Sequence, residues 1–240
     1  MRRIFLAKMT WLLIAAWGLA GCAVTRPAAD YSAVLTNPGR PENERALDAI
    51  RKPHEVMAFY GVKNGDKVAD ISAARGYYTV VLSQLVGPEG LVYSANAAPR
   101  PELHERVKQP SMSNVRLLDG PLDKLALPQD GSLDLVFIHL NYHDLPADMR
   151  VAMNRRILGA LKSGGVYGIV DHSAREGRGD QDAKAFHRID KNLVIKEATS
   201  VGFRLDSEGK MLSRADDSRD FSVTKLRDRS DRFVLKFEKP

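Results

Sequence analysis

The 240-residue chain has only one cysteine, Cys22, and this scarcity excludes several kinds of site. An internal disulfide needs a second cysteine, and a thiolate metal site needs several. A dense basic stripe is also missing, because acidic and basic residues alternate in stretches such as "RADDSRD" and "RDRSDR". We therefore expect a solvated exterior and no nucleic-acid partner. The sequence also has no repeat or low-complexity block, which are the patterns that would indicate a fibrous or disordered protein.

A long apolar run is also lacking, because "WLLIAAWGLAG" near the N-terminus is too short to span a bilayer as a mature helix. It follows a basic start and ends in "LAGC", Leu19 to Cys22, which resembles the lipobox of bacterial lipoproteins. The resemblance implies a signal peptide over residues 1–21 and acylation of the Cys22 thiol. We expect a periplasm-facing lipoprotein of the bacterial cell envelope, and Ala23 in place of Asp favours the outer membrane. Arg2-Arg3 leaves both general secretion and twin-arginine export open.

Removal of residues 1–21 would leave 219 residues (240 minus 21), enough for one substantial core. The formal charge would fall from +6 to +3, because Arg2, Arg3 and Lys8 are lost. Residues 22–41 are rich in Pro, Ala and turn formers and are interpreted as a membrane tether. The remaining residues, 42–240, are interpreted as one domain. It begins with a helix over 42–60 that Pro53 kinks or divides.

From residue 67 onward, short apolar strands alternate with helical stretches. This alternation predicts an α/β fold with a doubly wound, mostly parallel seven-stranded sheet. Two strands after the final helix predict that the sheet ends in an antiparallel C-terminal strand. The stretches expected to be helical are 77–86, 101–109, 146–161 and 182–202. A ligand crevice is expected at the carboxyl ends of the central strands.

The first strand, "KVADI", leads into Ile71-Ser72-Ala73-Ala74-Arg75-Gly76, which has the outline of a nucleotide-binding loop. In such loops glycines allow a tight turn, a close ligand approach and helix packing. Gly76 keeps the last role, while Ser72 and Ala74 occupy the other two places. If those residues need a positive φ, each costs about 1–2 kcal/mol.

The order of these pieces resembles class I S-adenosylmethionine-dependent methyltransferases. "GVKNGDKVADISAARGYYTVVLSQLVGPEGLVYSAN" is similar to their cofactor-binding half, and "LKSGGVYGIVDHS" to their late turn and fifth strand. "NYHDL", "DHS" and "HRID" are also similar to a bacterial group of predicted methyltransferases that often carry export signals. S-adenosylmethionine is the cofactor that the resemblance implies.

The resemblance also implies a set of cofactor-binding residues. Asp70 would support the loop and the methionine amino group, and Asn96 would bind the ribose in place of the usual acidic residue. Asn lacks the charge assistance of a carboxylate there. The other implied cofactor contacts are Ser72, Ala74 and Gly76 at the methionine end, Asp119 at the adenine, and His139 and Asn141 beside the methyl group.

Four of the six histidines fall near predicted strand ends, each with an aspartate nearby. A histidine suits general-base catalysis near neutral pH. His143 is the first candidate, oriented by Asp144 or Asp171, and His172 is a second. His187 and Asp190 are expected to share one face of the last long helix. The predicted catalytic residues are His143, Asp144, His172 and His187. The same side chains suit a divalent metal, although no compact ligand motif is present.

Three hypotheses follow. The chain is a methyltransferase for a small-molecule acceptor in the envelope, or a non-catalytic binding lipoprotein on the same scaffold, or a metal-dependent enzyme that uses the His/Asp set. Fold alone does not choose among them, because one scaffold hosts many activities. The acceptor, the oligomeric state and the source of the cofactor outside the cytoplasm stay open.

Overall fold

The computed structural model describes residues 29–226 and 229–240. The signal peptide 1–21, Cys22 and the first residues of the expected tether lie outside the described residues. Within them, the strands form one seven-stranded sheet in the order β3-β2-β1-β4-β5-β7-β6. Only β7 runs antiparallel to both of its neighbours, so the predicted fold class is confirmed. The strands are β1 (Lys67–Ile71), β2 (Leu91–Asn96), β3 (Val115–Asp119), β4 (Leu133–His139), β5 (Leu161–His172), β6 (Arg204–Gly209) and β7 (Arg232–Glu238).

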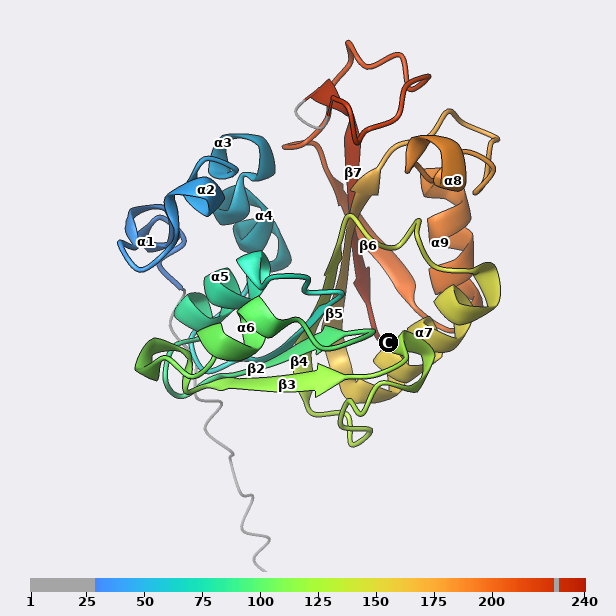
Figure 1. Cartoon of the computed structure of the whole chain (residues 1–240). Helices are drawn as coiled ribbons and strands as arrows, with labels where there is room; N and C mark the ends of the chain where they lie inside the picture. The colour runs from blue at the N-terminus through green and yellow to red at the C-terminus, as the bar shows by residue number, and fades with distance from the viewer. Residues whose placement is uncertain (1–28, 227–228) are drawn as a thin grey trace, which may run out of the picture.

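Helices cover both faces of this sheet (Figure 1). One face carries α4 (Pro53–Tyr60) and α5 (Tyr77–Val86), whose buried side chains pack with Val68, Leu135 and Phe137 of the strands. The opposite face carries α7 (Ala147–Ala160) and α9 (Lys191–Ser200). The remaining helical segments are α1 (Ala33–Thr36), α2 (Glu42–Arg45), α3 (Asp48–Arg51), α6 (Pro101–Arg106), η1 (Pro110–Met112), η2 (Leu122–Lys124) and α8 (Ala183–Phe186).

The sheet divides its side chains between these faces because successive residues of a strand point in opposite directions. In β4, Leu135 and Phe137 face α5, while Val136 and Ile138 face α7. The same alternation places residues that end the strands on one face or the other. The strand periodicity therefore decides which polar groups at the carboxyl edge can meet.

The domain begins earlier than residue 42, which corrects the expected tether in its second half. Val34 of α1 is fully buried, and Tyr31 donates a hydrogen bond to the Val62 carbonyl at 2.7 Å. The buried Arg40 guanidinium binds both carboxylate oxygens of Asp48, at 2.8 and 2.6 Å. Turn-forming composition predicted a linker, but apolar Val34 and the Arg40–Asp48 pair fasten this segment to the domain.

The helix expected over residues 182–202 is also corrected, because it consists of two separate helices. α8 ends at Phe186, and His187 adopts a left-handed conformation with φ of 55°. Ile189 then forms a parallel bridge with Ser173 at the end of β5, and Asp190 caps α9 by accepting from Asn192 N. His187 and Asp190 therefore do not share a helix face, because pairing with β5 outweighs helix continuity.

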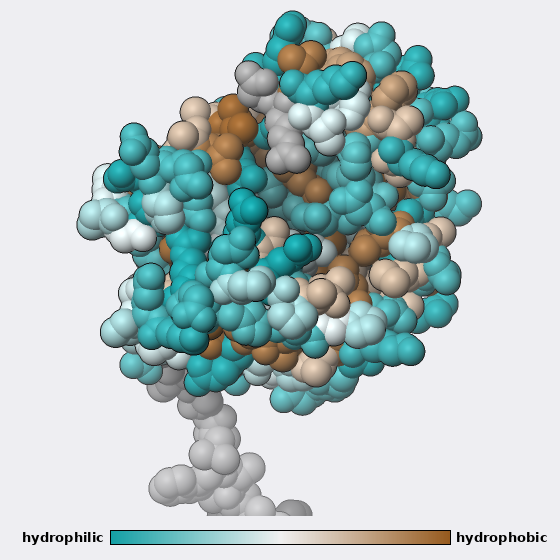
Figure 2. All heavy atoms as spheres, in the orientation of Figure 1, coloured by the Kyte–Doolittle hydropathy of each residue, from teal (hydrophilic) through white to brown (hydrophobic). Residues whose placement is uncertain are grey.

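Large hydrophobic side chains of the described residues are almost all buried or half-buried. Figure 2 shows a largely hydrophilic surface with scattered hydrophobic groups, and Leu226 is the one exposed large hydrophobic residue of the described ranges, at 39%. Among the described helices, none has the length and apolar character needed to cross a membrane.

Candidate active site

The loop after β1 has the backbone path of a glycine-rich loop without its glycines. Ser72 and Ala74 have φ of 56° and 52°, and Gly76 has φ of 89°. All three therefore lie in the left-handed region, which costs a non-glycine residue about 1–2 kcal/mol. Ala74 is exposed, so the described residues leave the apex of the loop open.

Hydrogen bonds to the main chain hold the loop in this conformation. Asn96 Oδ1 accepts from the Ala74 N–H at 2.8 Å, and Asn96 Nδ2 donates to the Ala74 carbonyl at 3.3 Å. The Ala73 N–H donates to the Ala95 carbonyl at 3.0 Å. Asn96 thus clamps the loop, at the position where the resemblance implies a ribose-binding acid. Its predicted contact with a ribose stays a prediction, since one N–H and one oxygen lone pair of the amide have no protein partner among these hydrogen bonds.

Asp70, at the end of β1, is 2% exposed. Its Oδ2 accepts from the Thr79 hydroxyl at 2.7 Å. Burial raises the Asp70 pKa to about 7, although the Thr79 hydrogen bonds and the Arg51 charge act in the other direction. Asp70 is therefore a buried carboxyl group poised near neutral pH, and a neighbouring cation would stabilise its charged form.

Arg51, the last residue of α3, lies near Asp70 and was not singled out from the sequence. Its guanidinium stacks over the Tyr77 ring at 4.3 Å from the centroid, and its carbonyl accepts from the Tyr78 hydroxyl at 3.3 Å. No carboxylate of the described residues pairs with it. The Lys52-Pro53 pair, which ends the helix just after Arg51, was the available signal that this residue lies at a turn.

His139 ends β4 on the face that carries α5. Its ring lies 4.6 Å from the Tyr78 ring, and its Nε2 is buried without a hydrogen-bond partner in the described structure. Burial, together with the charges of Arg51 and Arg232, lowers the His139 pKa well below its usual value. His139 is thus a neutral imidazole with an unused nitrogen, which is a ready contact for a ligand.

Asp119 ends β3 and Asn141 follows β4, two strands that β2 and β1 separate, and their side chains have different partners. Asp119 Oδ2 lies 2.6 Å from His104 Nε2 of α6, so its predicted adenine contact would be made by a carboxylate that His104 already orients. Asn141 donates to the His139 carbonyl at 2.8 Å, which steadies the chain beside His139.

His143 forms the centre of a second group of polar residues. Its Nδ1 lies 2.7 Å from Asp171 Oδ1, and its Nε2 lies 3.2 Å from Asp144 Oδ1. His187 Nδ1 lies 3.4 Å from the same Asp144 oxygen. Burial opposes a charge on His143, but Asp171 and Asp144 outweigh it and raise the His143 pKa to about 10.

A protonated imidazole donates hydrogen bonds and accepts no proton. The general-base role predicted for His143 therefore requires that its proton leave first.

The histidines that were expected near strand ends lie on different faces of the sheet. The Asp171 side chain lies on the same face of β5 as Tyr167 and Ile169, where it contacts His143. The His172 side chain points to the opposite face, where its Nδ1 lies 2.9 Å from Ser230 Oγ. The His143 and His172 ring centroids are still 6.1 Å apart at the edge of the sheet. The catalytic roles assigned to His143, Asp144, His172 and His187 stay predictions.

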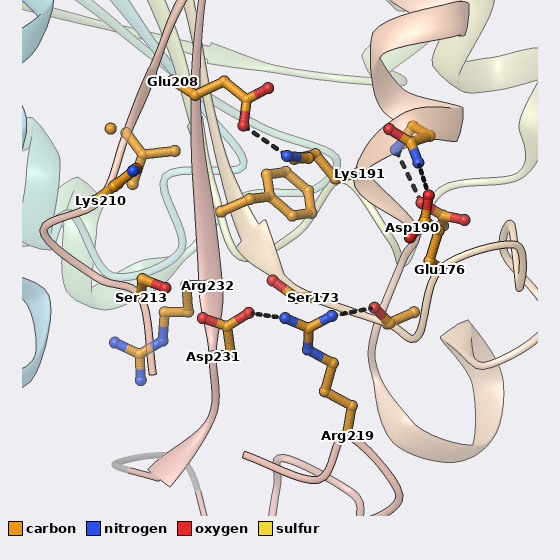
Figure 3. Close-up of a pocket in the computed structure, with 15 residues that line it drawn as sticks. Ser173, Glu176, Asp190, Lys191, Glu208, Lys210, Ser213, Arg219, Asp231 and Arg232 are labelled. Carbon is orange, nitrogen blue, oxygen red and sulfur yellow. Dashed lines mark hydrogen bonds and ion pairs between the residues drawn. The ribbon is translucent and has the colours of Figure 1, made fainter. Parts of the chain in front are cut away.

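A cavity of about 520 Å³ lies beyond these groups, between the end of β5, β6 and the start of β7 (Figure 3). Two ion pairs cross it, Lys191–Glu208 at 2.6 Å and Arg219–Asp231 at 2.8 Å. None of the site residues predicted from the sequence lines it. The lining carries four basic and four acidic side chains, so its formal charges balance.

A family model described as the ubiE/COQ5 methyltransferase family matches residues 48–195, which include the loop, Asn96, His139 and the His143 group. The chain belongs to the ubiE/COQ5 methyltransferase family. S-adenosylmethionine is the cofactor that this family and the structural neighbours imply.

Among curated proteins, the chain is similar to a demethylmenaquinone methyltransferase from Staphylococcus aureus, with 36% identity over 115 residues. The match covers 46% of this chain and 45% of that enzyme, so the chain spans less than half the length of this relative. A solved S-adenosylmethionine-dependent methyltransferase from Aquifex aeolicus has a TM-score of 0.62 and 19% identity, covering 87% of this chain and 97% of that one.

The solved [4+2]-cyclase SpnF has a TM-score of 0.64 and 15% identity, covering 91% of this chain and 88% of that one. Identities this low describe the fold alone. The pair of structures also illustrates that one fold carries proteins named for different reactions.

The described residues fit the implied cofactor at its amino-acid end. That end carries an ammonium group and a carboxylate, and the site offers the buried Asp70 carboxyl and the Arg51 guanidinium. The unpartnered Nε2 of His139 offers a third polar contact on the same face of the sheet. Ala74 is exposed at the apex of the loop, while its own N–H and carbonyl are bound by Asn96. Asp70 and Arg51 would hold the amino-acid end, and the loop would lie against it.

Proposed function

We propose that this chain is an S-adenosylmethionine-dependent methyltransferase that acts on a small-molecule acceptor in the bacterial cell envelope. The observation that carries the proposal is the conformation of the loop after β1. Ser72 and Ala74 retain a left-handed backbone that their side chains disfavour. Strain of this kind persists where surrounding contacts enforce it, and it concentrates at functional sites.

S-adenosylmethionine supplies an electrophilic methyl group on its sulfonium, and residues of the chain bind and orient this cofactor. Asp70 and Arg51 fix the two charges of the amino-acid end. His139 Nε2 is neutral and unpartnered, so it is the imidazole available to accept a hydrogen bond or a proton from an acceptor. In the free chain, His143 holds its proton between the Asp171 and Asp144 carboxylates.

The acceptor class rests on the family. The relatives are named for demethylmenaquinone, so a quinone is the first acceptor to test. An apolar acceptor of this kind would partition into a membrane, which agrees with a lipid-anchored enzyme. Envelope location rests on the "LAGC" motif and requires a supply of cofactor outside the cytoplasm. Palmitate labelling of expressed protein, with Cys22→Ala as control, tests the anchor.

A non-catalytic binding lipoprotein is the second candidate, favoured by one observation. The Asn96 amide binds the Ala74 N–H and carbonyl, at the place where the resemblance implies a ribose-binding acid. The scaffold would then keep its loop while having lost a cofactor contact.

Calorimetry of the full chain with S-adenosylmethionine and S-adenosylhomocysteine separates the two candidates. We expect both ligands to bind, and absence of binding at millimolar concentration would overturn the methyltransferase proposal.

Asp70→Ala should abolish binding. His143→Ala should spare binding and lower methyl transfer to demethylmenaquinone, measured with labelled methyl groups. His54→Ala is the matched control, since His54 is a half-exposed histidine outside the site. Loss of both properties in both site variants would instead indicate structural roles.

A further inference from the structure

We propose that His143, Asp144 and His187 form a binding site for one divalent transition-metal ion, separate from the residues that would bind the cofactor of the proposed methyltransferase. One donor atom from each of the three residues lies within 4.8 Å of the other two. His143 and Asp144 follow β4, whereas His187 follows α8, so the fold brings together ligands that are distant in sequence. Two imidazoles and one carboxylate form a set that such ions prefer.

His143 is oriented as a metal-binding histidine. Its Nδ1 lies against Asp171, so its Nε2 is directed toward Asp144. Asp171 is fully buried, and its second oxygen accepts from the His143 backbone N–H at 2.9 Å. A carboxylate behind the imidazole fixes the ring and strengthens its ligand nitrogen in metal sites. The structure therefore has both the ligand and its supporting carboxylate.

His187 is held by its neighbours rather than by a regular helix. Its φ of 55° lies in the left-handed region, a strained conformation for this residue. The next residue, Arg188, is fully buried and binds Asp217 and the Ser173 carbonyl, at 2.8 and 2.9 Å. Ile189 is bridged to the end of β5. These anchors fix the backbone that presents His187 to Asp144.

The donor set and its exposure indicate the kind of ion. Imidazole nitrogens suit zinc, iron, cobalt or nickel, whereas calcium and magnesium take mainly oxygen ligands. The Asp144 and His187 side chains are 49% and 38% exposed, while the His143 side chain is 3% exposed. An ion bound here would therefore be held from the protein side by His143, with open coordination positions toward solvent.

Metal titration of the full chain, expressed without a histidine tag and treated with a chelator, tests the site. Cobalt(II) is followed by its visible absorption and zinc(II) by calorimetry. We expect one ion per chain, at least tenfold weaker binding in His187→Ala and in Asp144→Asn, and unchanged binding in His54→Ala. His54 pairs with Glu55 at 3.8 Å and so controls for an exposed histidine–carboxylate pair. Asp171→Asn should weaken binding about 10- to 100-fold through the His143 orientation.

Equal binding in the wild type, His187→Ala and Asp144→Asn would overturn the proposal, as would no binding to the wild type at millimolar cobalt(II). Thermal unfolding without metal checks that the variants are folded. His187 and Asp144 are half-exposed, so their replacement should leave the fold intact. Titration with S-adenosylmethionine in the same variants keeps this site separate from the cofactor proposal, because loss of metal should leave cofactor binding unchanged.

Discussion

Two regions at the carboxyl edge of the sheet achieve order in different ways. The loop after β1 depends on its main chain, whose left-handed residues are held by Asn96 and Ala95. The group around His143 depends on charged side chains, with Asp171 buried beneath the imidazole. A site formed by the main chain tolerates replacement of glycine by small residues as long as hydrogen bonds hold the backbone in its conformation. A buried charged group instead loses much stability when one partner is removed.

Removal of Asp171 should have the largest effect. Asp171→Ala is expected to lower the free energy of unfolding by about 3–5 kcal/mol, because His143 loses the buried partner of its charge. Asp144 contacts the other nitrogen of the same ring but is half-exposed. Asp144→Ala should therefore cost less than about 1 kcal/mol in denaturant unfolding. Equal losses of unfolding free energy in Asp171→Ala and Asp144→Ala would show that burial does not decide how much each carboxylate contributes to stability.

Asp70→Asn should produce the next largest effect, on cofactor affinity. A hydrogen bond to a charged group contributes about 1.5–3 kcal/mol, so calorimetry at pH 8 should show S-adenosylmethionine binding about 10- to 150-fold weaker. Wild-type affinity should rise between pH 6 and 8, as Asp70 ionises through its pKa of about 7. Thr79 and Arg51 are the groups that act on this pKa in the free protein, in addition to burial. Asp130→Asn, on an exposed loop, is the control, and a pH slope surviving in Asp70→Asn would contradict the assignment.

The same carboxyl group should affect stability with a defined sign. The Asp70 pKa is raised from 3.8 to about 7 in the folded chain, so between these values the unfolded chain releases a proton that the folded chain keeps. The contribution of Asp70 to stability is therefore highest below pH 3.8, falls as the pH rises toward 7 and is constant above it. Urea unfolding of Asp70→Asn should lack this fall. If the contribution of Asp70 to the free energy of unfolding instead increased with pH, Asp70 would not be a buried carboxyl group with a raised pKa.

Arg51→Gln should reduce affinity for S-adenosylmethionine about fivefold, or ~1 kcal/mol, because the half-buried guanidinium is partly screened by solvent. 5′-Methylthioadenosine lacks the amino-acid end, so its affinity should be the same in Arg51→Gln and the wild type. Calorimetry with both ligands checks this. Equal weakening of both ligands would place Arg51 in a structural role through its stacking on Tyr77.

The smallest effect is expected from restoring a glycine. Ser72→Gly should raise the free energy of unfolding by about 0.5–1 kcal/mol, because relief of the positive φ exceeds the added entropy of the unfolded chain. Gly76→Ala should act in the opposite direction, since its φ is 89° and a Cβ there would lie 2.6 Å from Leu103 Cδ1. Chemical denaturation of both variants checks the pair. No gain in Ser72→Gly would mean that the positive φ of Ser72 carries no net strain.

Much of the fold could be predicted from the sequence because strand and helix periods are local. The β1 segment, α5 and the loop between them lie where the pattern indicated. The tether boundary was wrong because the burial of Val34 depends on a partner far along the chain. The helix break at His187 was missed because the bridge between Ile189 and Ser173 is equally non-local.

The candidate site could be predicted less completely. The adjacency of Asp171 and His172 already implies opposite faces, because strand residues alternate, and that signal was available. The arrangement of Arg51 beside Tyr77, and of Asn96 on Ala74, could not be inferred from spacing. Such contacts depend on how separate elements pack.

By itself, the sequence determined the alternating elements, the place of the loop and the residue types at each strand end, because these follow from periodicity and chemistry along the chain. Only the tertiary structure decided that His143 meets Asp171 and His187 while His139 stays unpartnered. The physical reason is that strand order and the two faces of the sheet bring distant side chains together or separate neighbouring ones.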